Sequence, residues 1–114
     1  MKKIVLLILI SISLCGCSSA SNKINKEYIK NLTKNQEYVI LDVRTASEYN
    51  ELHVKDSINL PVDNIKEINI EKDKIIFVYC KSGNRSSLAY KTLVDLGYTV
   101  YDLGGIDNII LDKE

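Results

Sequence analysis

The stretch that decides the fold is IIFVYCKSGNRS, residues 75–86. Its first five residues are apolar or aromatic, which is typical of a strand covered on both faces, and Cys80 follows at the end of that strand. A short polar loop comes next, and Ser86 to Leu96 has apolar residues at helical spacing, so the loop leads into the N-terminus of a helix. Amide groups in such a loop and helix N-terminus point at an anion and favour a thiolate. We therefore expect Cys80 to be a nucleophile held by its own loop.

Predicted strands and helices alternate on both sides of this stretch. The alternation indicates an α/β fold, in which a parallel sheet is covered by helices on both faces. The other predicted helices run from Lys26 to about Lys34, capped by Asn25; from the capping-box pattern Thr45 to Glu48 to about Glu51; from Val62 to Glu67; and, at the C-terminus, from Ile106 to Leu111. The other predicted strands run from Tyr38 to Val43, from Ser57 to Leu60 and from Tyr98 to Leu103, and a Gly104-Gly105 turn follows the last of them.

The N-terminus has the parts of an export signal. Met1 to Lys3 is basic, and Ile4 to Leu14 is apolar but too short to span a bilayer comfortably. The next residues, Leu14-Cys15-Gly16-Cys17, resemble the lipobox of bacterial lipoproteins. We expect a signal peptide over residues 1–16, a tether over residues 17–23, and a Cys17 that carries lipid with acyl chains such as palmitate. The protein would then lie at the outer face of a bacterial membrane; an uncleaved anchor and ordinary secretion are the alternatives.

Removal of this signal would leave Cys80 as the one free thiol, since Cys15 departs and Cys17 is alkylated. Cys80 and the single His53 cannot supply the four ligands of a structural zinc site, so we expect no metal and no other cofactor. A free thiol in an exported protein needs another explanation, and reactivity is the one that remains. If the chain is not cut there, a Cys17–Cys80 disulfide is the alternative.

The exported chain would have 98 residues, which suits one domain, here residues 24–114. Loss of Lys2 and Lys3 would leave 13 basic residues against 15 acidic ones, so no polybasic patch is expected for nucleic acid or anionic lipid. Membrane attachment would depend on the lipid, for which two acyl chains suffice. We expect a monomer.

Four segments, in this order, resemble the motifs of the rhodanese-like family of sulfurtransferases. The resemblance runs from about Ile24 to Ile109 and implies a five-stranded parallel sheet flanked by helices. The segments are Leu41-Asp42-Val43-Arg44 with Glu48-Tyr49, His53-Val54 with Ile58-Asn59-Leu60-Pro61, Val78-Tyr79-Cys80 with Gly83, Arg85 and Ser86, and Gly97-Tyr98 and Val100-Tyr101 with Leu103-Gly104-Gly105-Ile106.

Three positions depart from the family pattern. Leu52 and Asp56 stand where the family commonly has glycines around its histidine, and a positive φ at Leu52 would cost about 1–2 kcal/mol. Ile109 stands where a tryptophan is common. The turn near His53 and the packing of the C-terminus are therefore expected to differ from the family.

The resemblance implies that Cys80 forms a persulfide. Its thiolate would attack the outer sulfur of thiosulfate, release sulfite, and pass the sulfur to an external thiol, or to cyanide in an assay. Lys81 and Arg85 are expected to lower the pKa of Cys80 and to bind the anionic donor. The other loop residues expected to bind substrate are Ser82, Gly83, Asn84 and Ser86.

Loop length separates this reaction from a related one. Cys80 to Arg85 spans six residues, as in sulfurtransferases, whereas the related cell-cycle phosphatases and arsenate reductases have one residue more. Phosphatase activity is therefore disfavoured. The alternative is a module that carries sulfur or binds a protein without catalysis.

Three further residues are candidates for a layer behind the site. Asp42 either reaches the floor of the pocket or caps the next turn. We expect Arg44 to form a structural ion pair with Glu48, four residues later. His53 is either a residue of the substrate rim or a structural histidine.

Overall fold

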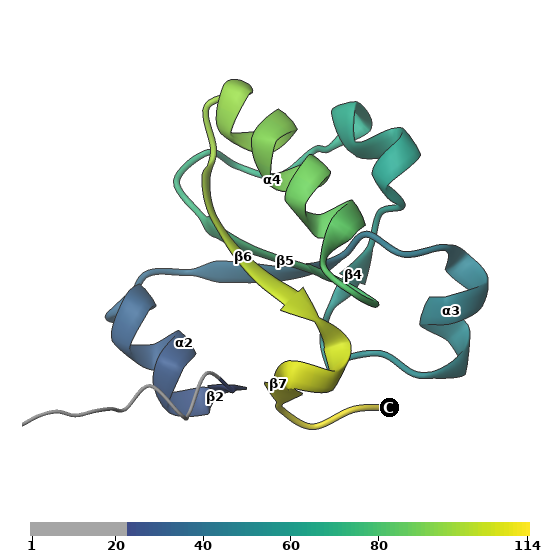
Figure 1. Cartoon of the computed structure of the whole chain (residues 1–114). Coiled ribbons are helices and arrows are strands. Elements are labelled where there is room, and N and C mark those ends of the chain that lie inside the picture. The colour runs from purple at the N-terminus through teal and green to yellow at the C-terminus, as the bar shows by residue number, and fades with distance from the viewer. Residues whose placement is uncertain (1–22) are drawn as a thin grey trace, which may run out of the picture.

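Strand β5 (Ile75–Cys80) lies at the centre of the molecule, and all six of its residues are buried. The computed structural model describes residues 23–114. In it β5 belongs to a four-stranded parallel sheet with the order β4-β3-β5-β6 (Figure 1). Its partners are β3 (Tyr38–Asp42), β4 (Ile58–Asn59) and β6 (Thr99–Gly105).

Alternate residues of β5 serve two separate cores, because successive side chains of a strand point to opposite faces. One core holds Ile75, Phe77 and Tyr79. The other holds Ile76, Val78 and Cys80. Cys80 therefore belongs to the face covered by the helix that follows it.

Helices cover both faces of the sheet, as the alternating pattern predicted (Figure 1). Helix α4 (Asn84–Asp95) and the 3-10 helix η3 (Val62–Glu67) lie on the Cys80 face, and α2 (Lys26–Thr33) lies on the other. Helix α3 (Ala46–Glu51) lies beyond the carboxyl end of β3. The two predicted helix starts are confirmed, since Asn25 caps α2 and Thr45 forms a capping box with Glu48.

The C-terminal segment differs from its prediction. We expected a helix from Ile106 to Leu111, but only a 3-10 turn, η4 (Ile106–Asn108), forms before strand β7 (Ile109–Ile110). Strand β7 pairs in parallel with β2 (Ile24–Asn25), and Ile109 is buried in the core. Burial of Ile109 and pairing with β2 replace the hydrogen bonds of a helix too short to be stable alone.

The expected five-stranded sheet is therefore not observed among residues 23–114. The four-stranded sheet and the β2–β7 pair are separate. Of the apolar residues spaced along α4, Ala89 and Leu93 are buried, whereas Leu88 is 58% exposed. Along residues 23–114, no helix has both the length and the apolar character needed to cross a membrane. The predicted signal peptide and lipidated Cys17 lie outside the described residues.

Candidate functional site

Cys80 ends β5, and its sulfur lies inside the loop that follows. The backbone N–H of Gly83 donates to Cys80 Sγ at 2.9 Å, and the N–H of Ser86 donates to it at 3.3 Å. The Ser86 hydroxyl oxygen lies 3.5 Å from the sulfur and 3.1 Å from the carbonyl oxygen of Gly83, to which it donates. Two backbone donors from one turn of chain thus point at a single sulfur atom, and the Ser86 hydroxyl oxygen lies beside it.

These contacts favour the thiolate. Burial of the sulfur opposes ionisation, but the Ser86 hydroxyl and the amides of Ser86, Gly83 and Ser82 outweigh it and lower the pKa of Cys80. The downward direction agrees with the prediction. The cause differs in part, since the hydrogen bonds of the loop, rather than the cations Lys81 and Arg85, are the main contributions.

Arg85 is engaged by a carboxylate of a neighbouring helix. Its two terminal nitrogens lie 2.7 and 3.1 Å from the two carboxylate oxygens of Glu48. This pair, together with contacts from Thr45, lowers the pKa of Glu48 to about 2. The N-terminus of α4 is therefore fastened to that of α3, and the positive charge of Arg85 beside the loop is offset.

The predicted ion pair between Arg44 and Glu48 was wrong. Arg44 turns inward instead, and its guanidinium lies 2.7 Å from the carboxylate of Asp42. Asp42 is fully buried and Arg44 almost so, whereas Glu48 is partly exposed and faces Arg85. Burial of Asp42 requires a cationic partner, and Arg44 is the one within reach.

Asp42 is the hub of a buried network. Besides the guanidinium of Arg44, the Asp42 carboxylate accepts hydrogen bonds from the backbone N–H of Arg44 at 2.9 Å and from the Tyr79 hydroxyl at 2.7 Å. The hydroxyl of Tyr79 in turn accepts from the N–H of Val54. Burial and the negative charge of Asp42 raise the pKa of Tyr79 to about 12. Of the two roles considered for Asp42, its contacts therefore match the turn-capping one.

Two glycines of β6 form the wall behind the loop. A β-bulge shifts the register, so that Tyr79 lies opposite Gly104 and Cys80 opposite Gly105. A Cβ on Gly105 would lie only 2.5 Å from the carbonyl oxygen of Lys81. The predicted Gly104-Gly105 turn is thus the end of a strand, where the missing side chain lets the loop pack.

His53 makes contacts of a structural kind. Its ring stacks on Tyr49 with centroids 3.7 Å apart, and its Nδ1 lies 2.7 Å from the Tyr49 carbonyl oxygen. Its Nε2 lies 3.5 Å from a carboxylate oxygen of Glu114.

The backbone strain considered for Leu52 is found elsewhere in this turn. The positive φ, 68°, is at Asp56, whereas Leu52 has an extended backbone.

The structure brings together part of the predicted site. Cys80, Gly83 and Ser86 are in direct contact, while Lys81 and Ser82 stand exposed on the loop and Asn84 at the start of α4. Asp42, Arg44 and His53 make their contacts elsewhere, as described above. No group of three or more metal-binding side chains occurs within the described part of the chain.

Sequence reasoning missed two residues of this site. It assigned Glu48 to Arg44 by their four-residue spacing in the sequence, and this spacing carries no information about Arg85 on α4. It assigned Gly105 to a turn, although a second glycine after an apolar strand also signals close approach of another backbone.

The family model for the rhodanese-like domain matches residues 25–111, which include the loop and both glycines of its wall. The chain belongs to the rhodanese-like family. Its α/β fold, with parallel sheets flanked by helices, is the rhodanese-like fold.

Two relatives differ in how much of their own length this chain covers. Thiosulfate sulfurtransferase PspE from Escherichia coli is 35% identical over 78 residues, covering 64% of this chain and 75% of that protein. The probable molybdopterin-synthase adenylyltransferase of Pyropia yezoensis is 40% identical over 67 residues, covering 55% of this chain. The chain spans only 18% of that enzyme's length.

Solved rhodanese structures agree in fold. A rhodanese with anions from E. coli superposes with a TM-score of 0.64 at 32% identity, covering 68% of this chain and 96% of the other. A rhodanese-related protein from Thermoplasma volcanium gives 0.61 at 36% identity, covering 74% of this chain and 85% of the other.

Proposed function

We propose that this protein is a sulfurtransferase that moves sulfane sulfur through a persulfide on Cys80. The observation that carries the proposal is the sulfur of Cys80 at the centre of the Gly83 and Ser86 donors, at the end of the central strand. Its membership of the rhodanese-like family and its similarity to a thiosulfate sulfurtransferase support the same reaction.

The proposed cycle has two displacements on sulfur. The Cys80 thiolate attacks the outer sulfur of thiosulfate or of a persulfide donor, and an S–S bond forms while the donor's S–S bond breaks. Sulfite, or the donor's thiolate, leaves with the electron pair of that bond. An external thiolate, or cyanide in an assay, then attacks the outer sulfur of the Cys80 persulfide, and the Cys80 thiolate is the leaving group.

The exposed residues of the loop are the proposed donor-binding groups. Lys81, Ser82 and Asn84 face solvent beside the buried sulfur, so an incoming anion meets them first. Arg85 is the weaker candidate of the two cations, because Glu48 already holds it. Lys81 therefore supplies most of the free positive charge, a compact and mobile one.

A sulfur carrier without turnover is the second candidate. One observation favours it: Cys80 is 0% exposed, so a donor reaches its sulfur only by displacing part of the loop. A partner protein could drive that displacement by docking, whereas a small anion has less binding energy to do so. In this case Cys80 would receive sulfur from the partner and hold it.

The two candidates are separated by an assay with thiosulfate and cyanide. We expect thiocyanate production by the wild type and none by Cys80→Ser, with Cys15→Ser and Cys17→Ser as active controls. Thiosulfate alone should add one sulfur atom to the intact mass, unless Cys80 is replaced. A protein with neither turnover nor added sulfur would contradict the first candidate; added sulfur from a protein persulfide alone would support the second.

We also propose a location for this reaction. In this proposal residues 1–16 are removed, residues 17–23 form a tether, and a lipid on Cys17 holds the domain of residues 24–114 at the outer face of a bacterial membrane. Mass spectrometry of the mature N-terminus tests it. A lipid-modified Cys17 is expected; an unmodified N-terminus at another residue would contradict the anchor.

A further inference from the structure

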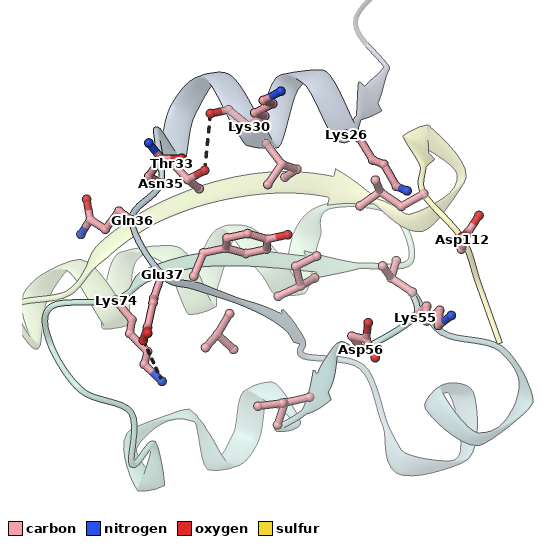
Figure 2. Close-up of a pocket in the computed structure, with 17 residues that line it drawn as sticks. Lys26, Lys30, Thr33, Asn35, Gln36, Glu37, Lys55, Asp56, Lys74 and Asp112 are labelled. Atoms are coloured by element: carbon pink, nitrogen blue, oxygen red, sulfur yellow. Dashed lines mark hydrogen bonds and ion pairs between the residues drawn. The ribbon is translucent and has the colours of Figure 1, made fainter.

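An open groove lies on the α2 side of the sheet, away from Cys80. Its volume is about 940 Å³, at the upper end of the ~300–1,000 Å³ of small-molecule sites, so it has room for several residues of a peptide. Helix α2 forms one wall, and the segment that leads into β4 forms the other (Figure 2). Residues 38–40 of β3 lie between the two walls.

The floor of the groove is an unpaired strand edge. Strand β4 pairs with β3 only at Leu41 and Asp42, because β4 has two residues. The backbone groups of Glu37 and Val43 bond toward β5. Since alternate residues of a strand point their backbone groups to opposite edges, those of Tyr38 and Ile40 point to the β4 side. The N–H groups of Tyr38 and Ile40 and the carbonyl of Tyr38 therefore face a stretch of edge that β4 does not reach.

Apolar side chains stand next to these free backbone groups. Tyr38 is 46% exposed and lies on the same face of β3 as the buried Ile40. Ile58 is 49% exposed and pairs with Leu41, so it lies on the opposite face of the sheet. An open edge beside exposed apolar side chains is a template for another strand, and proteins normally shield such edges. Here the edge is recessed, and within residues 23–114 no segment covers it.

The α2 wall of the groove is basic. Lys26 and Lys30 lie one turn apart on it, and within residues 23–114 no carboxylate lies at ion-pair distance from either. At one end of the groove, Glu37 is paired with Lys74 at 3.6 Å (Figure 2). An occupant with an acidic side chain toward α2 would complement the two free lysines.

We propose that this groove binds an extended segment of a partner protein, which adds a strand to the free edge of β3 and places an acidic side chain against Lys26 and Lys30. The backbone groups of Tyr38 and Ile40 would pair with the segment, whose side chains would pack on Tyr38 on the α2 face of the sheet and on Ile58 on the opposite face. A second copy of this chain fits less well, because its own edge is equally recessed between two walls. The proposal does not depend on sulfur transfer.

The probe is a synthetic peptide of alternating valine and threonine flanked by two glutamates, added to the isotope-labelled full chain. We expect the amide signals of Tyr38 and Ile40 to shift and their hydrogen exchange to slow by about tenfold or more. Methylation of alternate peptide nitrogens on one edge should abolish binding, while methylation on the other edge should leave it unchanged. Equal loss with both methylated peptides, or no binding, would overturn the proposal.

Two protein variants make the test specific. Tyr38→Pro removes one free N–H at the first residue of β3, a strand position where proline is tolerated, and should weaken binding about tenfold. The double variant Lys26→Glu with Lys30→Glu should weaken binding several-fold, and a lysine-flanked peptide should restore it; Lys66→Glu on the other face is the matched control. Slow exchange at Tyr38 and Ile40 before any peptide is added would mean that the chain or a second copy fills the groove, and would overturn the proposal.

Discussion

Ser86 is the residue on which the ionisation of Cys80 most depends. Its backbone N–H donates to the sulfur and its hydroxyl oxygen also lies in contact with the sulfur, whereas Gly83 contacts the sulfur only through its N–H. The side-chain contact is the larger of the two Ser86 contributions that lower the pKa of Cys80. A thiolate reacts and a thiol does not, so the loss of this hydroxyl should be visible as a loss of rate near neutral pH.

Ser86→Ala tests this dependence. Without the hydroxyl the pKa of Cys80 should rise, because burial continues to oppose the thiolate while one charge-assisted contact is gone. Alkylation of Cys80 by iodoacetamide should be roughly tenfold slower at pH 7, and the midpoint of its pH profile should lie at higher pH. Ser87→Ala, a change at the next, partly buried residue, is the control. An unchanged profile would show that the backbone amides alone hold the sulfur.

The two glycines at the end of β6 differ in what a side chain would disturb. Gly105 has an ordinary φ of −86° but no room for a Cβ, and Gly104 has a φ of +79° with nothing within 4 Å of a Cβ. A methyl group on Gly105 therefore pushes the carbonyl of Lys81, whereas one on Gly104 strains only its own backbone.

Gly105→Ala should lower sulfur transfer by about tenfold or more, since a shift of ~1 Å at a reacting group can cost ~100-fold. Gly104→Ala should keep most of the activity and lose about 1 kcal/mol of the free energy of unfolding from backbone strain. Urea unfolding and the thiosulfate assay, made on both variants, separate the two effects. Equal activity in the two variants would argue against Gly105 as the wall of the loop.

At the scale of the elements, the ion pair of Glu48 with Arg85 fastens α3 to α4. Its contribution to stability depends on pH with a defined sign. The pKa of Glu48 is about 2 in the folded protein against an ordinary 4.5, so folding favours the ionised carboxylate. The stabilisation is therefore complete above about pH 4.5 and is lost as the pH falls toward 2.

Glu48→Gln removes the charge but keeps the side-chain oxygen that a capping box uses. Both partners are about one-third exposed, so we expect a loss of only roughly 1 kcal/mol in the free energy of unfolding at pH 7. The difference from the wild type should shrink between pH 4.5 and 2 in urea titrations. Glu51→Gln, on the same helix, is the control. A difference that stays constant over this range would show that the charge of Glu48 is not the cause.

The elements that could be predicted from sequence are those decided by local chemistry. Asn25 and Thr45 cap helices by bonds to residues three positions later, and the β5 run is apolar throughout, so the neighbouring sequence contains the needed information. The predicted helix after Ile106 failed for the opposite reason. Its fate depends on pairing of Ile109 with Ile24, a contact between the two ends of the domain that no local pattern reveals.

The same distinction holds for the site. The position of Cys80 and its loop follows from one stretch of sequence, and so does the direction of its pKa. The ion-pair partners of Arg85 and Arg44 do not follow from one stretch of sequence. Glu48 and Asp42 compete for the two arginines, and the outcome depends on which carboxylate is buried. Spacing along the chain favoured the pair with Glu48, and the desolvated Asp42 decided otherwise.

At the scale of the whole molecule, the Asp42 network ties together segments far apart in the chain. Through Arg44 it reaches the carbonyl of Leu52 at 2.6 Å, and through Tyr79 it reaches the N–H of Val54 at 3.0 Å. It thus joins β3 and β5 to the segment that connects α3 to β4. Tyr79 and Cys80 are adjacent, yet they point to opposite faces, so the network supports the site from the other side of the sheet.

Asp42→Asn should therefore be among the most destabilising single changes. It leaves the guanidinium of Arg44 buried without a counter-charge, for which the expected loss in the free energy of unfolding is about 3–5 kcal/mol. Tyr79→Phe removes only a hydroxyl from the same network and should cost about 1–3 kcal/mol. Urea unfolding at pH 7 measures both losses. If the two variants lose the same free energy of unfolding, the hydrogen bond from Tyr79, and not the charge of Arg44, is what makes Asp42 necessary. In either case the folded Tyr79→Phe variant should keep the lowered pKa of Cys80, because the groups that donate to the Cys80 sulfur lie on the other face of the sheet.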